Sequence, residues 1–184
     1  RYLVTDRELD LPQLYDKGPY IYANEGALPA AYVVHQARVV EDVQQRLEVL
    51  QDPAFDPRAE VILSSPPASI PAQDVGVGGY ELASVLHEGQ DRVIIDVTVM
   101  QPGYLVLADT HYPGWRATVD GQPADILEAN HAFRAVQLDR GEHTISFEYR
   151  PESFRLGAWI TISALVVLAS IPIISGLLHR IYKK

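Results

Sequence analysis

The stretch HTISFEYRPESFRLGAWITISALVVLASIPIISGLL, residues 143–178, decides the fold of this chain. Its first residues alternate, with Ile145, Phe147 and Tyr149 separated by polar side chains, which is typical of a strand with one buried face. Residues 156–178 then form a run of 23 residues without Asp, Glu, Lys, Arg or His. At about 1.5 Å per residue, such a helix can cross a hydrocarbon core of about 30 Å. The stretch therefore predicts a β-structured domain that leads directly into a membrane helix.

The predicted membrane helix covers residues 154–179, and a basic tail, residues 180–184, follows it. An aromatic side chain near its start favours the membrane–water boundary. Small, hydroxyl-bearing and helix-perturbing residues in the run suit close packing against other helices. The residues that we expect to anchor and dock this helix are Trp159, Thr161, Ser163, Ser170, Pro172, Ser175 and Gly176. The expected partners are membrane lipid and other transmembrane helices or subunits of a membrane complex.

Upstream of the helix, residues 80–153 contain short apolar segments that are separated by turn residues. The predicted strands are Glu81–Leu86, Val93–Met100, Tyr104–Ala108, Trp115–Val119, Ala124–Leu127, Ala132–Leu138 and His143–Tyr149. Asp120-Gly121 is a hairpin signal, because glycine readily accepts a positive φ. This spacing predicts a β-sandwich of jelly-roll or immunoglobulin-like type. We expect the aromatic residues Trp115, Phe133, Phe147 and Tyr149 to lie in its core.

The remaining sequence predicts two further parts. Residues 1–63 form a small α+β segment, with predicted strands at Tyr2–Val4, Tyr20–Tyr22, Ala31–Val34 and Val61–Leu63 and an amphipathic helix at Glu41–Gln51. Residues 64–79 are rich in Pro, Ser and Gly and are predicted to be a linker. The fold class is thus an α+β segment and a mainly β sandwich, followed by one transmembrane helix.

Charge and composition exclude several classes of function. Residues 1–179 carry 12 Lys and Arg against 24 Asp and Glu, a net charge of −12. An acidic domain of this kind does not bind nucleic acid and does not lie flat on anionic lipid. The chain has no Cys, and so no disulfide, thiolate metal site or thiol nucleophile.

No motif in the sequence predicts catalysis, cofactor binding or metal binding. His111, His131 and His143 form neither an HxH nor an HExxH spacing. Gly76-Val77-Gly78-Gly79 follows a Pro-rich segment, which fits a flexible linker better than a phosphate loop. Residues 109–112, with the sequence Asp-Thr-His-Tyr, could be drawn as an acid/base cluster. We interpret them instead as a loop before the turn that leads into Trp115. We therefore expect no catalytic residue, no cofactor and no metal.

The orientation in the membrane is open from charge alone. Three cations follow the helix, Arg180, Lys183 and Lys184, and three precede it within about 20 residues, Arg140, Arg150 and Arg155. The tight cluster after the helix favours a cytoplasmic C-terminus. The alternative is a tail-anchored protein whose domain lies in the cytoplasm. A domain outside the membrane needs an upstream export or membrane segment, so we expect the chain to be the C-terminal part of a longer protein.

A series of short segments resembles a known family. These segments are Gly103–Trp115, Val119–Gly121, Ala129–Val136, Gly141–His143 and Phe147–Pro151, with weaker likeness at Arg1–Thr5, Asn24–Pro29, Ala31–Val34, Asp52-Pro53 and Phe55–Pro57. In this order they resemble the C-terminal region of the YfhO family of bacterial membrane proteins, which are glycosyltransferase-like and of the GT-C type. The resemblance implies a many-helix protein whose extracytoplasmic domain precedes a final transmembrane helix with a cytoplasmic C-terminus in the cell membrane.

The resemblance also implies a function for the full-length protein, the transfer of sugar from a polyprenyl-phosphate donor to a surface polymer. The catalytic acid of such proteins is expected in a loop between early transmembrane helices, so no catalytic residue can be assigned to this chain. We therefore expect a non-catalytic extracytoplasmic domain with its membrane anchor. The alternative is a single-pass accessory subunit of a larger membrane complex, respiratory or photosynthetic, that docks through its helix.

Overall fold

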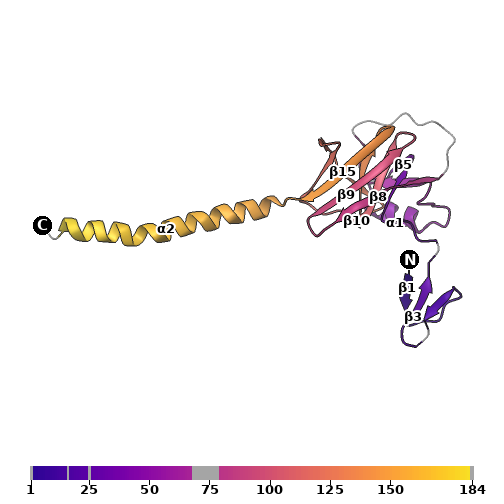
Figure 1. The fold of residues 1–184 in the computed structure, drawn as a ribbon, viewed down its shortest axis with the longest axis horizontal. Helices are drawn as coiled ribbons and strands as arrows, with labels where there is room; N and C mark the ends of the chain where they lie inside the picture. Colours follow the sequence, from indigo (N-terminus) through magenta and orange to yellow (C-terminus); the bar gives the residue numbers. More distant parts are fainter. Residues whose placement is uncertain (1, 16, 25, 68–78, 183–184) are drawn as a thin grey trace.

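A computed structural model of the chain describes residues 2–15, 17–24, 26–67 and 79–182, with only the backbone described at 155 and 173–182. The described part contains a small three-stranded sheet, two larger sheets that pack face to face, and two helices, α1 (Val43–Gln51) and α2 (Glu152–Tyr182) (Figure 1). This confirms the predicted mainly β fold followed by one long C-terminal helix.

The larger sheet has seven strands in the order β5 (Gln36–Val39), β6 (Glu60–Leu63), β13 (Leu127–Ala129), β14 (Phe133–Leu138), β10 (Gly103–Thr110), β4 (Ala31–Val34) and β7 (Tyr80–Leu82). β5 and β6 are parallel, and α1 lies in the connection between them, because parallel neighbours need a crossover. α1 begins after Asp42, whose carboxylate accepts a hydrogen bond from the Gln45 N–H at 2.9 Å, and Pro53 follows its end. These bounds agree with the predicted amphipathic helix.

The second sheet has five strands and is antiparallel throughout. Its order is β12 (Gln122–Ala124), β11 (Trp115–Val119), β15 (Gly141–Tyr149), β9 (Arg92–Val99) and β8 (Ser84–Glu88). β15 is its central strand and pairs with β9 over eight residues and with β11 over five. The strand that continues into α2 is therefore held on both sides.

The main core lies between the two sheets. Val33, Leu105 and Val136 from the larger sheet pack in one cluster with Ile145 and Phe147 from β15. Of the four aromatic residues predicted for the core, Phe147 alone is buried; Trp115, Phe133 and Tyr149 are half-buried. Trp115 and Tyr149 occupy strand ends at the rim of the sandwich, and Phe133 packs on the opposite face of the larger sheet. The prediction of which side chains of β15 face the core is correct. How far each aromatic ring is buried depends also on its position along the strand.

A second cluster covers the opposite face of the larger sheet. Its largest buried residues are Tyr32, Leu63 and Tyr104. Burial raises the pKa of the Tyr32 hydroxyl to about 12, and a hydrogen bond with Asn130 opposes that rise. Asn130 also fixes β6, since its side-chain oxygen accepts from the Ile62 N–H at 2.9 Å and its own N–H donates to the Ile62 carbonyl at 2.8 Å. Strands far apart in sequence are thus joined at this face.

The division into parts differs from the expected one. Strands β4, β5 and β6, from the predicted α+β segment 1–63, hydrogen-bond into the same sheet as β10, β13 and β14 of the predicted sandwich 80–153. The two ranges therefore share one sheet and one core. Most of the predicted linker 64–79, including Gly76, Val77 and Gly78, lies outside the described residues.

Two predicted strands are each divided between the sheets. The segment predicted as Glu81–Leu86 forms the end of β7 in the larger sheet and the start of β8 in the smaller one. The segment predicted as Ala124–Leu127 likewise contains the end of β12 and the start of β13. At both places the chain crosses from one sheet to the other. Apolar residues continue through both crossings, so each segment reads as one strand in the sequence.

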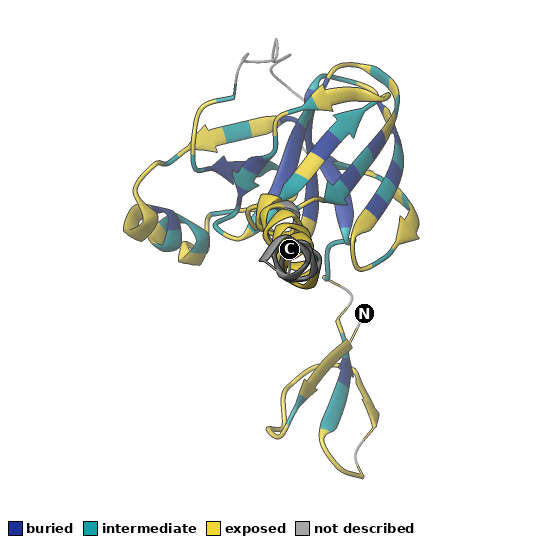
Figure 2. Cartoon of the chain, turned by 90° about the vertical axis from the view of Figure 1, so that its left-hand side faces the viewer, coloured by how far each residue is buried: buried dark blue, intermediate teal, exposed yellow. Residues whose placement is uncertain are grey.

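The small N-terminal sheet, in the order β1 (Tyr2–Thr5), β3 (Tyr20–Ala23) and β2 (Gln13–Tyr15), stands apart from the sandwich (Figures 1 and 2). Tyr22 is its buried residue, and its hydroxyl accepts a hydrogen bond from the Leu9 N–H at 2.8 Å. Most other side chains of this sheet are exposed.

α2 extends away from the sandwich, and its described side chains are almost all exposed (Figure 2). Arg150 and Pro151 are the two residues between β15 and α2. The span Glu152–Pro172 is long enough and apolar enough to cross a membrane. The helix starts two residues earlier than the predicted span 154–179 and runs past its end.

Candidate functional site

The end of the sandwich from which α2 leaves is formed by a loop, residues 111–114, and by the last residues of β15. The His111 N–H donates to the Ala132 carbonyl at 2.7 Å, and the Arg150 N–H donates to the Gly114 carbonyl at 2.7 Å. The Tyr149 N–H donates to the Asp91 carbonyl at 2.8 Å. These backbone bonds fix the loop and the exit of the chain into α2.

Gly114 is required by this close packing. Its φ is +108°, which side-chain-bearing residues rarely adopt. A Cβ at this position would lie 2.9 Å from the Tyr149 ring and 3.2 Å from the Pro151 Cα. The Pro113-Gly114 turn therefore brings the loop directly against the junction between β15 and α2.

Trp115 is held between two side chains. The Arg134 guanidinium lies 3.8 Å from its ring centroid, and the Tyr149 ring centroid lies 5.4 Å away. Arg134 also lies 5.2 Å from the Phe147 ring. A cation over an aromatic face is attracted by the electrons of the ring, more strongly where water is excluded. The indole is thus fixed in position by both sheets.

Arg134 is the functional-site residue that the sequence did not reveal. Its side chain is 0% exposed and forms an ion pair with Asp109, whose side chain is 52% exposed. Burial lowers the pKa of Arg134, and the Asp109 carboxylate opposes this through its charge and its hydrogen bond. Nε and Nη1 of Arg134 have no hydrogen-bond partner among the described residues. The available signal was a single charged residue between Phe133 and Ala135 in a strand that has no other charge.

The pair assigns a role to the segment 109–112. Asp109 accepts hydrogen bonds from Arg134 and from the Thr110 N–H, the latter at 2.7 Å. The carboxylate is therefore engaged in holding Arg134 and the end of β10. Asp109 and Thr110 are the last residues of β10, and only His111 and Tyr112 lie in the predicted loop.

A hollow of about 470 Å³, here called the membrane-proximal pocket, lies beside this cluster and is lined by Tyr112–Arg116 and Tyr149–Ser153. Its rim carries two arginines. Arg116 lies 3.6 Å from a carboxylate oxygen of Glu152, and Arg150 lies 2.9 Å from one of Glu148. Aromatic walls and exposed guanidinium groups can bind an anionic or a polar ligand, but they supply no acid/base pair.

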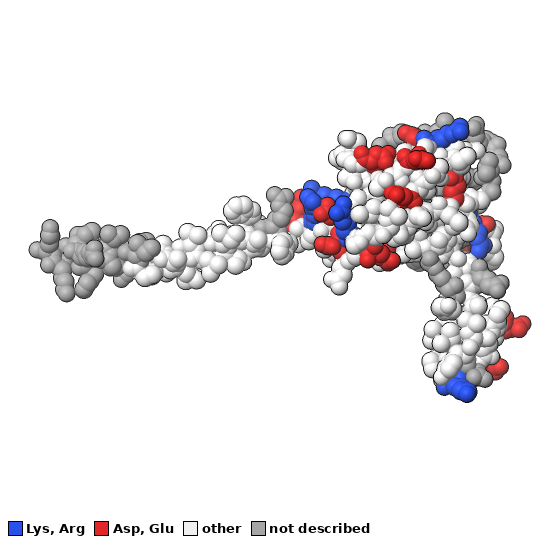
Figure 3. All heavy atoms as spheres, in the orientation of Figure 1, with Lys and Arg blue, Asp and Glu red and all other residues white. Residues whose placement is uncertain are grey.

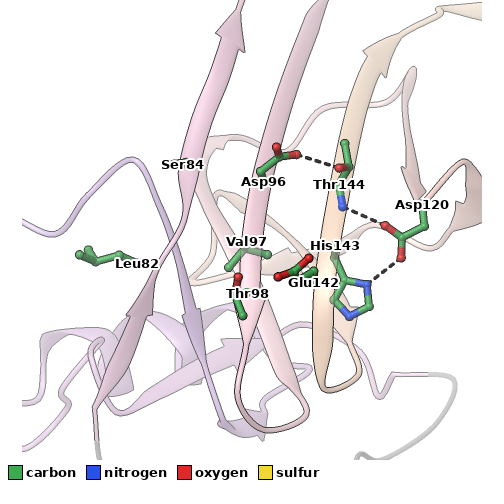
Figure 4. A pocket seen from close by; sticks show the side chains of 9 residues that line it. All are labelled: Leu82, Ser84, Asp96, Val97, Thr98, Asp120, Glu142, His143 and Thr144. Carbon is green, nitrogen blue, oxygen red and sulfur yellow. Dashed lines mark hydrogen bonds and ion pairs between the residues drawn. The ribbon is translucent and has the colours of Figure 1, made fainter.

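A larger hollow of about 600 Å³ lies on the outer face of the five-stranded sheet (Figure 4). Asp120 accepts from His143 Nδ1 at 2.7 Å and from the Thr144 N–H at 2.9 Å, and the Thr144 hydroxyl donates to Asp96 at 2.8 Å. The hydrogen bond from His143 and, to a smaller extent, that from the Thr144 N–H lower the pKa of Asp120. The predicted hairpin at Asp120-Gly121 is present, with φ values of 52° and 78°. His143 Nε2 also lies 3.0 Å from the Asp139 carbonyl, so the cluster joins two turns.

The three histidines of the sandwich do not converge. His143 belongs to the turn cluster and His111 lies in the loop after β10. His131 follows Asn130 in the turn between β13 and β14, where both residues have positive φ. Within residues 2–67 and 79–182, as far as they are described, no three His, Asp or Glu side chains lie close enough together to hold a metal ion.

The predicted docking residues all lie on α2, but not on one face. At 3.6 residues per turn, Trp159, Ser163 and Ser170 share one side of the helix, and Thr161 and Pro172 share the opposite side. The hydroxyls of Thr161, Ser163 and Ser170 donate to backbone carbonyls of the preceding turn, at 2.9, 2.8 and 2.6 Å. The side chain of Ser175 and the position of Gly176 on a face lie outside the described residues. Docking through these residues stays a prediction.

Comparison with known proteins identifies the part of the chain that carries this site. Residues 83–161 match the family model described as "Bacterial membrane protein YfhO". A protein of Bacillus subtilis (strain 168) named "Uncharacterized protein YfhO" is 24% identical over 87 residues, which are 47% of this chain and 10% of that relative. No solved structure matches the chain significantly. The matched range includes β9–β15, the membrane-proximal pocket and the first turns of α2, and over this range the chain is similar to the YfhO family of bacterial membrane proteins.

Proposed function

We propose that this chain is the extracytoplasmic sandwich and membrane anchor of a YfhO-type, glycosyltransferase-like protein. The full-length protein would transfer sugar from a polyprenyl-phosphate donor to a surface polymer. The sandwich itself is non-catalytic and holds the acceptor or covers the active site. The observation that carries this proposal is the two-residue connection between β15 and α2, which keeps the pocket end of the sandwich next to the start of the apolar helix.

The proposed orientation places residues 1–153 outside the cytoplasm and the C-terminus inside. The cluster of Arg180, Lys183 and Lys184 supports it, since cationic flanks favour the cytoplasmic side. The resemblance to the YfhO family, whose extracytoplasmic domain precedes the last helix, supports it as well.

Protease treatment of intact spheroplasts tests the orientation. With an epitope after Lys184, external protease is expected to leave a short protected fragment that contains α2 and the epitope. Cleavage of the domain only after the membrane is permeabilised would establish the tail-anchored arrangement instead.

A transfer assay tests the proposed division of labour. A full-length YfhO-type protein that contains this region is expected to transfer labelled sugar from a polyprenyl-phosphate donor, whereas the purified 184-residue chain transfers none. Transfer by the short chain alone would overturn the non-catalytic assignment.

A second candidate function is that of a single-pass accessory subunit. It is favoured by α2, because the described side chains from Glu152 to Pro172 are not covered by any other described part of the chain. A helix of this kind is available for packing against neighbouring helices in a membrane complex.

A further inference from the structure

We propose that the rim of the membrane-proximal pocket binds the phosphate of anionic lipid headgroups through Arg116 and Arg150. The domain then stands upright on the bilayer on this end alone. The inference goes beyond the proposed function, because it depends neither on sugar transfer nor on which side of the membrane the domain occupies.

The height of the pocket above the hydrocarbon core follows from the helix. Glu152 and Ser153 line the pocket, and the uncharged run begins at Leu156. Four residues of helix rise about 6 Å. The headgroup layer on each side of a bilayer is about 5–7 Å thick, from the difference between its full and hydrocarbon thickness. If α2 crosses the membrane, the pocket opens at the level of the headgroups.

The chemistry of the rim matches a phosphate. The side chains of Arg116 and Arg150 are 57% and 62% exposed, and each makes one ion pair in which a single terminal nitrogen takes part. A guanidinium has five N–H donors in a planar fork that suits bidentate binding of phosphate oxygens. The 3.6 Å separation between Arg116 and Glu152 is long for a hydrogen bond. Both cations can therefore accept a phosphate in addition to their carboxylate partners.

The distribution of charge selects this end of the domain. Where α2 leaves the sandwich, basic side chains gather with acidic ones among them, while acidic side chains predominate over the rest of the visible face of the sandwich (Figure 3). The pocket on the five-stranded sheet is lined by three acidic residues, Asp96, Asp120 and Glu142. An anionic surface repels that face, whereas at the end where α2 leaves, Arg116 and Arg150 offset Glu152 and Glu148 and remain exposed to a phosphate. The net acidity of the domain is thus compatible with lipid contact, provided that the contact is confined to one end.

Aromatic residues complete the surface. Tyr112 lines the pocket with 59% of its surface exposed, and Phe154 in the first turn of α2 is 76% exposed. Aromatic rings favour the boundary between hydrocarbon and headgroups. Trp115, fixed between Arg134 and Tyr149, gives this end a rigid wall.

The test places the full chain in lipid nanodiscs and measures how closely Trp115 approaches the headgroups. The chain has two tryptophans, so a Trp159→Phe background leaves Trp115 as the reporter. Discs of phosphatidylcholine, with or without phosphatidylglycerol, carry a trace of lipid with a nitroxide on its headgroup. We expect stronger quenching of Trp115 in discs that contain phosphatidylglycerol, and loss of that gain in Arg116→Gln/Arg150→Gln. Each arginine near an anionic surface changes the bound population about fivefold.

Arg140→Gln is the matched control, because Arg140 precedes β15 at the end opposite Tyr149. It is expected to leave quenching unchanged. With both arginines present, raising the salt concentration should weaken binding to phosphatidylglycerol and reduce the quenching of Trp115. This measurement does not depend on the folding of any arginine variant. Equal quenching in neutral and anionic discs, or an equal loss in Arg140→Gln, would overturn the proposal. Both faces of a disc present the same lipids, so an error in the proposed orientation leaves this readout unchanged.

Discussion

Arg134 is a fully buried cation whose carboxylate partner, Asp109, is half in water, and this difference predicts an asymmetry between two substitutions. Asp109→Ala leaves a buried charge without its partner and should lower the free energy of unfolding by about 2–3 kcal/mol, less than for a fully buried pair because Asp109 is exposed. Arg134→Met fills similar volume and returns Asp109 to water, so it should cost about 1 kcal/mol or less. Denaturant unfolding of the chain in mild detergent measures both. Equal costs would mean that the ion pair does not govern the stability of this end.

Asp120 offers a test with pH. Because its pKa is lowered in the folded protein, mainly by the hydrogen bond from His143, the carboxylate stabilises the fold above its unfolded pKa near 3.8. That contribution disappears as the pH falls through the lower folded pKa. Asp120→Asn keeps a residue that tolerates the positive φ of 52°, so the turn itself should remain.

We therefore expect Asp120→Asn to lower the melting temperature at pH 6 and to approach the unsubstituted chain as the pH falls through the lowered pKa of the folded state. Thermal unfolding at a series of pH values measures this convergence. Asp125→Asn, at an exposed position after β12, should show no such pH-dependent difference. A difference in melting temperature between Asp120→Asn and the unsubstituted chain that stays constant with pH would contradict the role assigned to the carboxylate.

At the scale of the element, β15 is the strand whose pattern was readable from sequence. Phe147 is 0% exposed and lies between the sheets, so Phe147→Ala should cost about 3–5 kcal/mol through the lost burial and the cavity that remains. Ser146 points to the outer face of the same strand, and Ser146→Ala should change stability by less than about 0.5 kcal/mol. Unfolding midpoints of the two variants compare the faces directly. Similar midpoints would mean that the two faces of β15 are not distinguished by burial.

The second prediction for an element concerns α2. We expect replacement of residues 154–179 by poly-Leu to keep the chain in the membrane but to lose co-purifying membrane proteins from mild detergent. The reason is that Gly, Ser and Thr allow close approach of helices, which leucine prevents. The hydroxyls already bond within α2, so the shape of the helix surface should matter more than hydrogen bonds across it. Equal recovery of partners from both versions would leave α2 as a plain anchor.

Single strands and both helices could be predicted from the sequence, because their patterns repeat every two or 3.6 residues. β5 was missed because it is only four residues long, its alternation rests on Ala37 and Val39 alone, and it lies at the edge of the sheet. The candidate site was only partly predictable. The loop before Trp115 is marked by Pro113-Gly114, but the pairing of Arg134 with Asp109 joins positions 25 residues apart and leaves no local signal.

At the scale of the whole molecule, the assembly of the sheets could not be predicted. The N-terminal strands join the sandwich at two places: β4 pairs with β10 over four residues, and β6 pairs with β13 through Leu63 and Ala129, supported by Asn130. Nothing in either segment specifies the other, because any exposed strand edge of suitable length offers the same hydrogen-bonding groups. The net acidity of the domain, in contrast, follows from composition alone, whereas the pairing of Arg116 and Arg150 with Glu152 and Glu148 where α2 begins becomes visible only in the folded chain.

The two-residue connection from β15 to α2 also couples the rotation of the helix to the orientation of the sandwich. β15 is hydrogen-bonded to β9 and β11, and the Arg150 N–H donates to the Gly114 carbonyl. Rotation of α2 about its own axis would therefore rotate the sandwich with it. Each residue of an α-helix adds about 100° of rotation and about 1.5 Å of length along the helix axis. One residue inserted near Gly157 would therefore rotate the pocket by about 100° around the axis of α2. An insertion of about seven residues, two full turns, would nearly restore its original direction. A rotation of α2 in the bilayer can thus change the direction in which the pocket faces, in addition to its height above the membrane.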